Sequence, residues 1–492
     1  MHAPGADKLT RIAFAAGAIV VVVYFILFAG GGIRIGFSHD DLMIMHRAFV
    51  NGTLGRHLAN SFLFFLPAVR PMGNALYRLT YDFAGLNPLP LHAICFTLAL
   101  LNVFVLFLVT ARISGSFEIG LLAALIGAFH DNMMLVYYDA GTCYDLLAFP
   151  FFYLALLLYV SIRQRGRMPG TREIALVFIC FVLALAAKEI ALSLPLILIA
   201  YELVWDPPRS VRAAVSWMLR QGRTSLLCGA AAILFVGVRV YGAEGLANMT
   251  AFKPDYSLVA YLNVLSVVMN DLFYRVDTFT PMSTAIFWIV LIAIAALMRS
   301  RFLIFCLSLA LIGLLPLGFV TPRGLYSVYV PFVGLWAYAA GLLVMARRYF
   351  TAEYLKTAPR NGDTLGLLAQ GALFIAVLLP LVSVNRDNFK PNWTWLSSEA
   401  DQIEDVLHSL EGLHLNLPPG ARVLVLNDAF DPSRFAYDTL YLISLLHHDP
   451  NLEVEHCAQP ATDAAASYAA VLTYRDGRFQ RVQGCAGRSC CR

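Results

Sequence analysis

Two adjacent carboxylates, Asp40 and Asp41, are the residues of this sequence that most plainly suggest chemistry. They follow Ser38 and His39, a few residues after the first long apolar run. Neighbouring carboxylates at a membrane boundary repel each other and lose solvation, so their presence requires an explanation. One interpretation is a general base that removes a proton from an acceptor hydroxyl, with the second carboxylate orienting the loop. The other is an ordinary helix start, in which these polar residues cap the first turn.

Three cations lie in short polar segments between apolar runs. Arg70, before a proline, is a candidate for binding a lipid phosphate, or else an interfacial residue whose charge reaches water. Lys188 and Glu189 separate two apolar runs, where a charged pair either compensates itself or has a function. Arg323, with Tyr326 close behind it, can neutralise a leaving phosphate or simply anchor its loop.

A further polar cluster contains His130, Asp131, Asp139 and Asp145. We interpret it as a candidate acceptor or donor loop. A His-Asp-Asp metal site can be drawn from it, but the spacing is not diagnostic and we expect no metal and no cofactor. His92, inside an apolar run, is interpreted as a hydrogen-bonding core residue.

Several motifs of soluble-substrate chemistry are missing from the sequence. It contains no phosphate-binding loop, dinucleotide fingerprint, serine-hydrolase elbow or zinc-protease helix motif. A soluble nucleotide donor and ATP-driven transport are therefore not predicted.

The chain that carries these residues is strongly apolar. Of its 492 residues 59% are hydrophobic and 14% charged, whereas soluble domains carry about 25% charged residues. Apolar runs of roughly 17 to 25 residues can cross the hydrocarbon core as helices. We predict a mainly α polytopic protein with eleven spans, near 12–30, 88–111, 117–130, 144–162, 174–187, 189–205, 224–241, 282–298, 302–319, 327–346 and 365–384.

Charge distribution suggests how the chain is oriented. Lys8 and Arg11 precede the first run, which ends in three glycines without a cleavage site, so we predict a retained helix rather than a signal peptide. Arginines such as Arg163, Arg165 and Arg167 gather on the side of the N-terminus, which places that side in the cytoplasm. The net charge of +4 then reflects topology, and no nucleic-acid binding is expected.

Three segments on the opposite side are too long to be simple connections. Residues 33–88 contain two amphipathic stretches, 42–54 and 62–77, that we expect to lie along the membrane surface. Residues 241–281 contain a third candidate surface helix, near 256–273.

The third long segment is the tail, which we predict to be a separate small α/β domain, 385–492, after a helical domain, 1–384. An acidic helix is expected near 397–410, a second helix near 437–446, and strands near 422–427, 452–457 and 468–474.

Nine cysteines fall into two groups. Those in the apolar runs are interpreted as small apolar fillers: Cys95, Cys143, Cys180, Cys228 and Cys306. The tail holds Cys457, Cys485, Cys490 and Cys491, and an oxidising compartment permits a disulfide there, with Cys457 to Cys485 as the predicted pair.

In order and spacing, these elements resemble the GT-C membrane glycosyltransferases. Within that group they are most similar to the protein O-mannosyltransferases whose helical domain precedes tetratricopeptide repeats, and to their bacterial relatives. The matching elements are Asp40-Asp41, Arg70-Pro71, the Gly-Leu-Asn-Pro before the second span, Lys188-Glu189, and the segment that begins Arg323-Gly-Leu-Tyr. Together they cover residues 33 to about 345. Two features depart from the family: Arg323 stands where a Glu-Arg pair is usual, and the tail shows no tetratricopeptide repeat.

The resemblance implies an inverting glycosyltransferase that moves a sugar from a polyprenyl phosphate to a hydroxyl of a glycan, lipid or protein, usually without a metal. It implies Asp40 or Asp41 as the base, with slight preference for Asp40, and Arg70, Lys188 and Arg323 around the donor. The site would face the periplasm from a bacterial inner membrane, or lie in the endoplasmic reticulum membrane of a eukaryote. A lipid-carrier flippase and a non-catalytic scaffold of the same fold remain as alternative functions.

Overall fold

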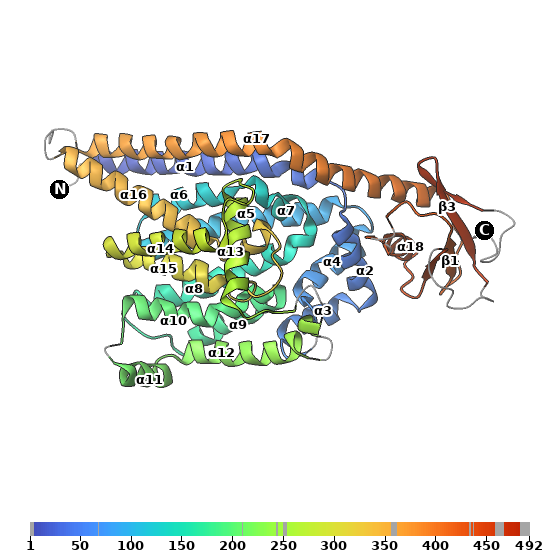
Figure 1. Ribbon diagram of the computed structural model, residues 1–492, viewed down its shortest axis with the longest axis horizontal. Helices are drawn as coiled ribbons and strands as arrows, with labels where there is room; N and C mark the ends of the chain where they lie inside the picture. Colours follow the sequence, from blue (N-terminus) through green and yellow to red (C-terminus); the bar gives the residue numbers. More distant parts are fainter. Residues whose placement is uncertain are drawn as a thin grey trace.

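The computed structural model describes residues 4–66, 68–208, 210–242, 245–248, 253–355, 362–431, 434–435, 437–457 and 467–482. The protein is mainly α-helical, with 73% helix and 18 helices in this part of the chain. Figure 1 shows a helical bundle followed by a small sheet at one end. The helices before the sheet are α1 (Pro4–Ala29), α2 (His39–Val50), α3 (Leu54–Phe62), α4 (Pro71–Ala84), α5 (Leu89–Ser114), α6 (Phe117–Ala128), α7 (Met134–Tyr138), α8 (Cys143–Arg163), α9 (Thr171–Ala187), α10 (Leu194–Trp205), α11 (Val211–Arg220), α12 (Arg223–Phe235), α13 (Leu258–Leu272), α14 (Pro281–Leu297), α15 (Arg301–Leu314), α16 (Val333–Leu355) and α17 (Gly362–Gly412).

Several of these helices can cross a membrane. Each of the eleven apolar runs contains a helix. Five helical segments among the described residues are long and apolar enough to span alone, and a sixth is obtained if α6 and the bent segment after it count as one span. Others are shorter, because polar or proline-containing turns interrupt them; α10 begins only at Leu194, after a 3₁₀ turn at Glu189–Ser193. The protein is therefore a multi-pass membrane protein with five or six candidate spans by this measure.

One predicted amphipathic helix is wrong. The stretch 62–77 is divided, because α3 ends at Phe62 and α4 begins at Pro71. Proline suits the first turn of a helix, where its missing N–H is not needed, but it cannot continue one. Arg70 just before it has φ 44°, in the left-handed region, which ends any helical path. The other two stretches, 42–54 and 256–273, do form helices, α2 and α13; their position at a membrane surface stays a prediction.

Helix α17 connects the two parts of the molecule. It lies beside α1 along one flank of the bundle and continues without a break to the sheet (Figure 1). Its 51 residues join the predicted span 365–384 to the predicted acidic helix 397–410, so it passes through the expected domain boundary at residue 385. Pro380 and Pro391 both lie inside it.

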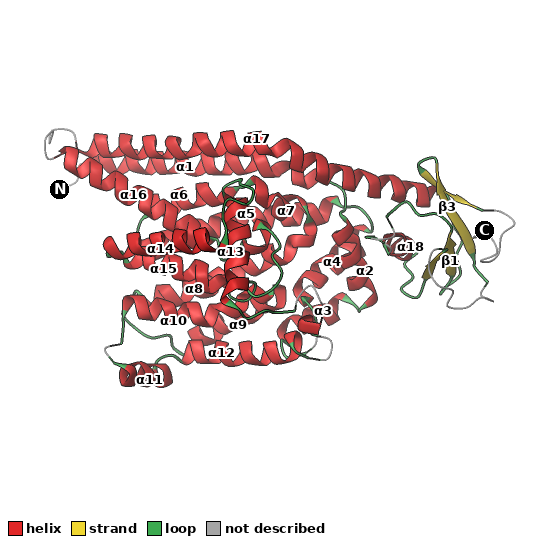
Figure 2. Cartoon of the chain, in the orientation of Figure 1, coloured by secondary structure: helices red, strands yellow, loops and turns green. Residues whose placement is uncertain are grey.

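The tail forms the small α/β unit that the sequence predicts (Figure 2). Its elements are β1 (Arg422–Val425), α18 (Asp438–Leu446), β2 (Glu453–His456), β3 (Ala470–Arg475) and β4 (Arg478–Arg481). The sheet order is β2-β1-β3-β4, with β1 parallel to β2 and β3, and β4 antiparallel to β3. Strand β1 is one of the two interior strands and is parallel to both of its neighbours, and Val423 and Leu424 are fully buried on its two faces, as expected for such a strand. Strand β4 was not predicted.

The cysteines follow their expected pattern where the structure describes them. The five in the apolar runs are unpaired and buried. Cys457 is disulfide-bonded. Cys485, Cys490 and Cys491 lie outside the described residues, so the pairing with Cys485 stays a prediction.

Candidate active site

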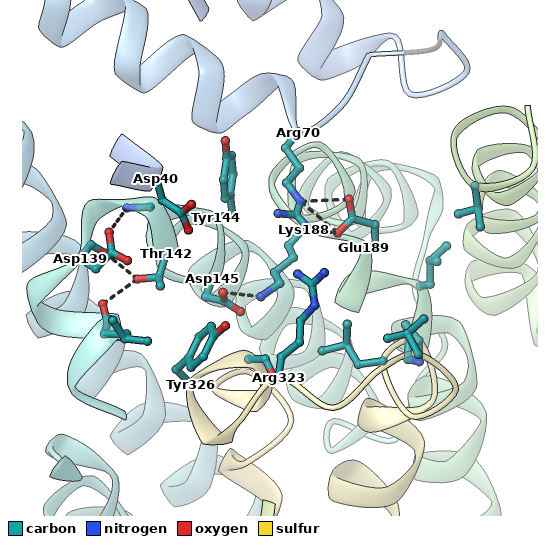
Figure 3. A pocket seen from close by; sticks show the side chains of 18 of the residues that line it. Asp40, Arg70, Asp139, Thr142, Tyr144, Asp145, Lys188, Glu189, Arg323 and Tyr326 are labelled. Carbon is teal, nitrogen blue, oxygen red and sulfur yellow. Dashed lines mark hydrogen bonds and ion pairs between the residues drawn. The ribbon is translucent and has the colours of Figure 1, made fainter. Parts of the chain in front are cut away.

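A cavity of about 540 Å³ lies where the helical bundle meets α17 and the segment before α18. Ligand sites generally measure roughly 300 to 1,000 Å³. Its wall brings together polar side chains from distant parts of the sequence (Figure 3). Eight of the predicted site residues line it: Asp40, Arg70, Asp139, Asp145, Lys188, Glu189, Arg323 and Tyr326.

The two adjacent carboxylates have different surroundings. Asp41 is fully buried in a capping box: its N–H donates to Ser38 Oγ (3.1 Å), and its carboxylate accepts from the Ser38 N–H (2.9 Å). The Tyr77 hydroxyl donates to the same carboxylate. Burial raises the pKa of Asp41 to about 6, although the Ser38 and Tyr77 hydrogen bonds lower it. Asp40, in contrast, is exposed and lines the cavity. The helix-start interpretation thus fits Asp41, while Asp40 is the carboxylate that a ligand can reach.

Asp139 supports the loop that carries Asp40. Its Oδ1 accepts from Ser38 Oγ and from the Gly141 N–H, each at 2.8 Å. Burial raises the pKa of Asp139 well above its usual range, and the charges of Asp41 and Asp40 raise it further. Asp139 therefore ties the start of α2 to the turn before α8.

Gly141 lies directly against Asp40, which makes it a sensitive position. A Cβ atom there would be 2.9 Å from Asp40 Cβ and 3.0 Å from Asp139 Oδ1. We expect Gly141→Ala to lower stability by about 1 to 3 kcal/mol, the usual cost of overpacking. The thermal unfolding midpoint in detergent measures this. Gly371→Ala in α17 is the matched control, because no atom lies within 4 Å of its new Cβ. Equal midpoints for the two variants would contradict the prediction.

Four charges form two crossed ion pairs beside Asp40. Lys188 Nζ donates to the Asp145 carboxylate. Arg70 binds Glu189 through two nitrogens, Nε to Oε1 at 3.1 Å and Nη2 to Oε2 at 2.9 Å. The interpretation of Lys188 and Glu189 as a pair that compensates itself is therefore wrong: each binds a different partner. The reason is that Lys188 has an extended backbone, and successive side chains along extended backbone point to opposite sides.

Arg70 is also held by an aromatic ring. Its guanidinium carbon lies 5.0 Å from the centre of the Tyr144 ring. The left-handed backbone at Arg70 directs its side chain into the cavity wall just before α4 begins. A cation that is both paired and stacked is well fixed in place.

Arg323 and Tyr326 come from the loop between α15 and α16. Gly324 there has φ 86°, a conformation that favours glycine, and the next N–H, of Leu325, donates to Asp271 Oδ2 (2.9 Å). Figure 3 shows the Arg323 side chain reaching from this loop toward Lys188. The loop thus adds a third cation to the side of the cavity that holds the two ion pairs.

His130 and Asp131 do not belong to the cavity. His130 Nε2 donates to the Leu272 carbonyl (3.1 Å), and its ring stacks on Tyr274. The Asp131 carboxylate accepts from the Asn392 amide (2.5 Å). Both residues join the segment after α6 to α13 and α17, so the predicted loop cluster is divided between a structural junction and the cavity. In the described ranges, no three His, Cys, Asp or Glu residues are grouped so that they could hold a metal ion. His92 is buried, with Nε2 3.9 Å from Asp41 Oδ2, as a core residue would be.

Other cavity residues were not singled out from the sequence. One group is largely apolar and comes from the π-helical turn after α12 (Val236–Val240) and from the loops near 241–256 and 315–320. A second group comes from α17 and the segment before α18. These residues are recognised as part of the cavity only from contacts between distant segments, because no local sequence motif contains them. The first group includes Val236, Val240, Tyr241, Tyr256, Leu315, Leu317, Phe319 and Val320, and the second includes Trp395, Leu396, Glu399 and Phe435.

Comparison with known proteins leaves the family open. The chain matches no protein-family model, and no curated protein matches it closely enough to identify a relative.

Proposed function

We propose that this protein is an inverting glycosyltransferase that moves a sugar from a polyprenyl phosphate to an acceptor hydroxyl. The observation that carries the proposal is the composition of one cavity. It combines an accessible carboxylate, Asp40, with three cations that Figure 3 shows close to one another and with several apolar side chains in the same wall. A base, a phosphate-binding group and a wall for a hydrocarbon chain are what such a donor and reaction require.

The reaction places definite demands on these residues. Asp40 accepts the proton of the acceptor hydroxyl, whose oxygen attacks the anomeric carbon of the donor sugar. The bond between that carbon and the phosphate oxygen breaks, and the lipid phosphate leaves with one more negative charge. Arg70, Lys188 and Arg323 stabilise this charge most strongly in the transition state.

The two ion pairs affect how the cations act. Asp145 and Glu189 are the counter-charges of Lys188 and Arg70, so neither buried cation lacks an acidic partner before a ligand binds. Their remaining N–H groups are directional donors for a phosphate, and Arg323 adds a third positive charge from the loop between α15 and α16. Tyr326 lines the same wall as Arg323, and we assign it a contact with the donor sugar.

The proposal is tested by incubating the purified protein with polyprenyl phosphates that carry different sugars, and with a panel of alcohol acceptors. Release of the free lipid phosphate together with a glycosylated product is the expected result. A protein that binds and moves the lipid between membrane leaflets without cleaving it would be a transporter instead, and the proposal would fail.

Arg323→Ala tests the role of the third cation. We expect a fall of about 10² in turnover with a much smaller change in donor binding, because the charge it stabilises develops only as the sugar leaves. Single-turnover kinetics and a separate donor-binding measurement distinguish the two effects. Arg275→Ala is the matched control, since Arg275 is exposed and does not line the cavity. A loss confined to donor binding would remove Arg323 from this role.

The same proposal includes a topology. We propose eleven crossings, with the N-terminus in the cytoplasm and the α/β unit on the other side, supported by the distribution of arginines. A reporter fused after Arg492 that is active only outside the cytoplasm should be active. Activity of a cytoplasm-only reporter at that position would reject this topology.

A further inference from the structure

The residue before Asp40 is held by the C-terminal part of the chain. His39 Nδ1 hydrogen-bonds to the Asp438 carboxylate. Its ring stacks face to face on Phe435, with centres 3.6 Å apart and planes 12° from parallel. Its backbone N–H donates to Glu399 Oε1 of α17 (3.0 Å). Three segments separated from residue 39 by more than 350 positions therefore fix this residue.

Asp438 is itself anchored to the sheet through its neighbour. Thr439 Oγ1 donates to Asp428 Oδ1 (2.6 Å), and Asp428 Oδ2 lies 3.2 Å from Nδ1 of His456 at the end of β2. Asp438, Thr439 and His456 are all buried. A continuous set of polar contacts thus runs from the ends of β1 and β2, through the first turn of α18, to the first turn of α2.

The opposite side of the same turn is held by the helical bundle. Ser38 donates to Asp139 and forms the capping box with Asp41. Residues on both sides of Asp40 are therefore fixed, while the Asp40 carboxylate accepts no hydrogen bond from any described residue. The direction in which that carboxylate points depends on contacts made by its neighbours. Misplacement by about 1 Å can reduce a reaction rate by about 10².

We propose that Asp438 is a positioning residue that acts through His39 to direct Asp40 into the cavity, so that the C-terminal α/β unit is an integral part of the catalytic centre. This inference rests on the proposed function for its kinetic consequences, but the contact itself has a consequence that needs no activity. Removing the Asp438 carboxylate should loosen the first turn of α2 even in a protein without substrate.

The experiment compares three variants of the full-length protein. Asp438→Ala removes the partner of His39. Asp438→Asn keeps an oxygen that can accept the His39 hydrogen bond. Tyr81→Phe removes a different contact between the two parts, since the Tyr81 hydroxyl lies 2.6 Å from the Leu445 carbonyl and 2.7 Å from His448 Nδ1. Tyr81 does not line the cavity.

Two readouts are measured for each variant. The first is backbone hydrogen exchange of residues 37–42, with exchange in β1 and β3 as a check that the sheet stays folded. The second is the turnover number and the KM for the donor. For Asp438→Ala we expect faster exchange at 37–42 only, and a turnover reduced about 10- to 100-fold with donor KM within about twofold. Asp438→Asn should stay close to the wild type in exchange at 37–42 and in turnover. Tyr81→Phe should match the wild type in both.

The outcomes are distinguishable. A wild type without transfer activity refutes the proposed function, while the exchange result still tests the contact. An active Asp438→Ala with wild-type exchange refutes the positioning role. Equal losses in Asp438→Ala and Tyr81→Phe also refute it, because the effect would then come from general loosening between the two parts.

Discussion

Replacing Asp40 by Asn should remove nearly all sugar transfer while the protein stays folded and still binds the donor. Asparagine preserves the size of the side chain but cannot accept the proton of the acceptor hydroxyl. A positioned general base contributes typically about 10² to 10⁴ in rate, so a loss in that range is expected. Because Asp40 is exposed and supports no described hydrogen bond, the substitution should leave the unfolding midpoint unchanged.

Asp41→Asn is the matched control, and its main effect should be a loss of stability rather than a loss of transfer. Its two carboxylate oxygens accept from the Ser38 N–H and the Tyr77 hydroxyl, and an amide can accept at only one of them. The buried mismatch should cost about 1 to 3 kcal/mol of stability, with a smaller loss of transfer. Wild-type turnover in the Asp40→Asn variant would exclude Asp40 as the base, and a large loss in Asp41→Asn alone would assign the role to Asp41.

The second large effect is expected from the pair formed by Lys188 and Asp145. Both side chains are less than 10% exposed, so removing one leaves the other as a buried charge without its partner. Lys188→Met should destabilise the protein by about 3 to 5 kcal/mol. Asp145→Asn should destabilise it less. The double variant should regain much of that loss, because it buries no unpaired charge.

A double-mutant cycle on unfolding midpoints in one detergent measures this coupling. The exposed pair Arg167 and Glu173 supplies the comparison, and its removal should change the midpoint little. The double variant should nevertheless be inactive in transfer if Lys188 binds the donor phosphate. Additive losses of stability would show that the two charges do not compensate each other, and a fully active double variant would remove Lys188 from the donor site.

Elements that depend on a contiguous stretch of sequence are the ones that the sequence predicts best. Apolar runs of sufficient length became helices, and the alternation and turn residues of the tail predicted β1, α18, β2 and β3. Period and composition decide such elements because the energy that forms them comes from burying one face of a contiguous segment. The short strand β4 escaped notice, since its four residues, Arg478–Arg481, are mostly polar and are defined by pairing with β3.

Grouping of the site residues was predicted only in part. Asp40, Arg70, Lys188 and Arg323 were expected to meet, and they line one cavity. Which charge pairs with which could not be predicted, because Glu189 follows Lys188 in sequence yet binds Arg70. His130 was grouped with Asp139 by proximity in sequence, but His130 lies at the bend after α6 and Asp139 lies at the far end of the helical segment Asp131–Tyr138.

Contacts over the longest sequence separations were not predicted at all. Phe435 stacks on His39, and Asp438 hydrogen-bonds to it, because α17 brings the sheet to the end of the bundle where α2 begins. Neither residue belongs to a motif, and both would be assigned to an ordinary surface of an α/β unit.

Helix α17 also fixes the angle by which the α/β unit is rotated, about the helix axis, relative to the helical bundle. An α-helix advances about 1.5 Å and turns about 100° per residue. Deleting one residue near the middle of α17 would therefore turn Trp395 and Glu399 away from the cavity and swing Asp438 from His39, even though every local interaction in the sheet survived. Seven-residue insertions nearly restore the original angle but move the sheet about 10 Å along the axis. The length of this helix is thus constrained residue by residue, unlike that of a flexible linker.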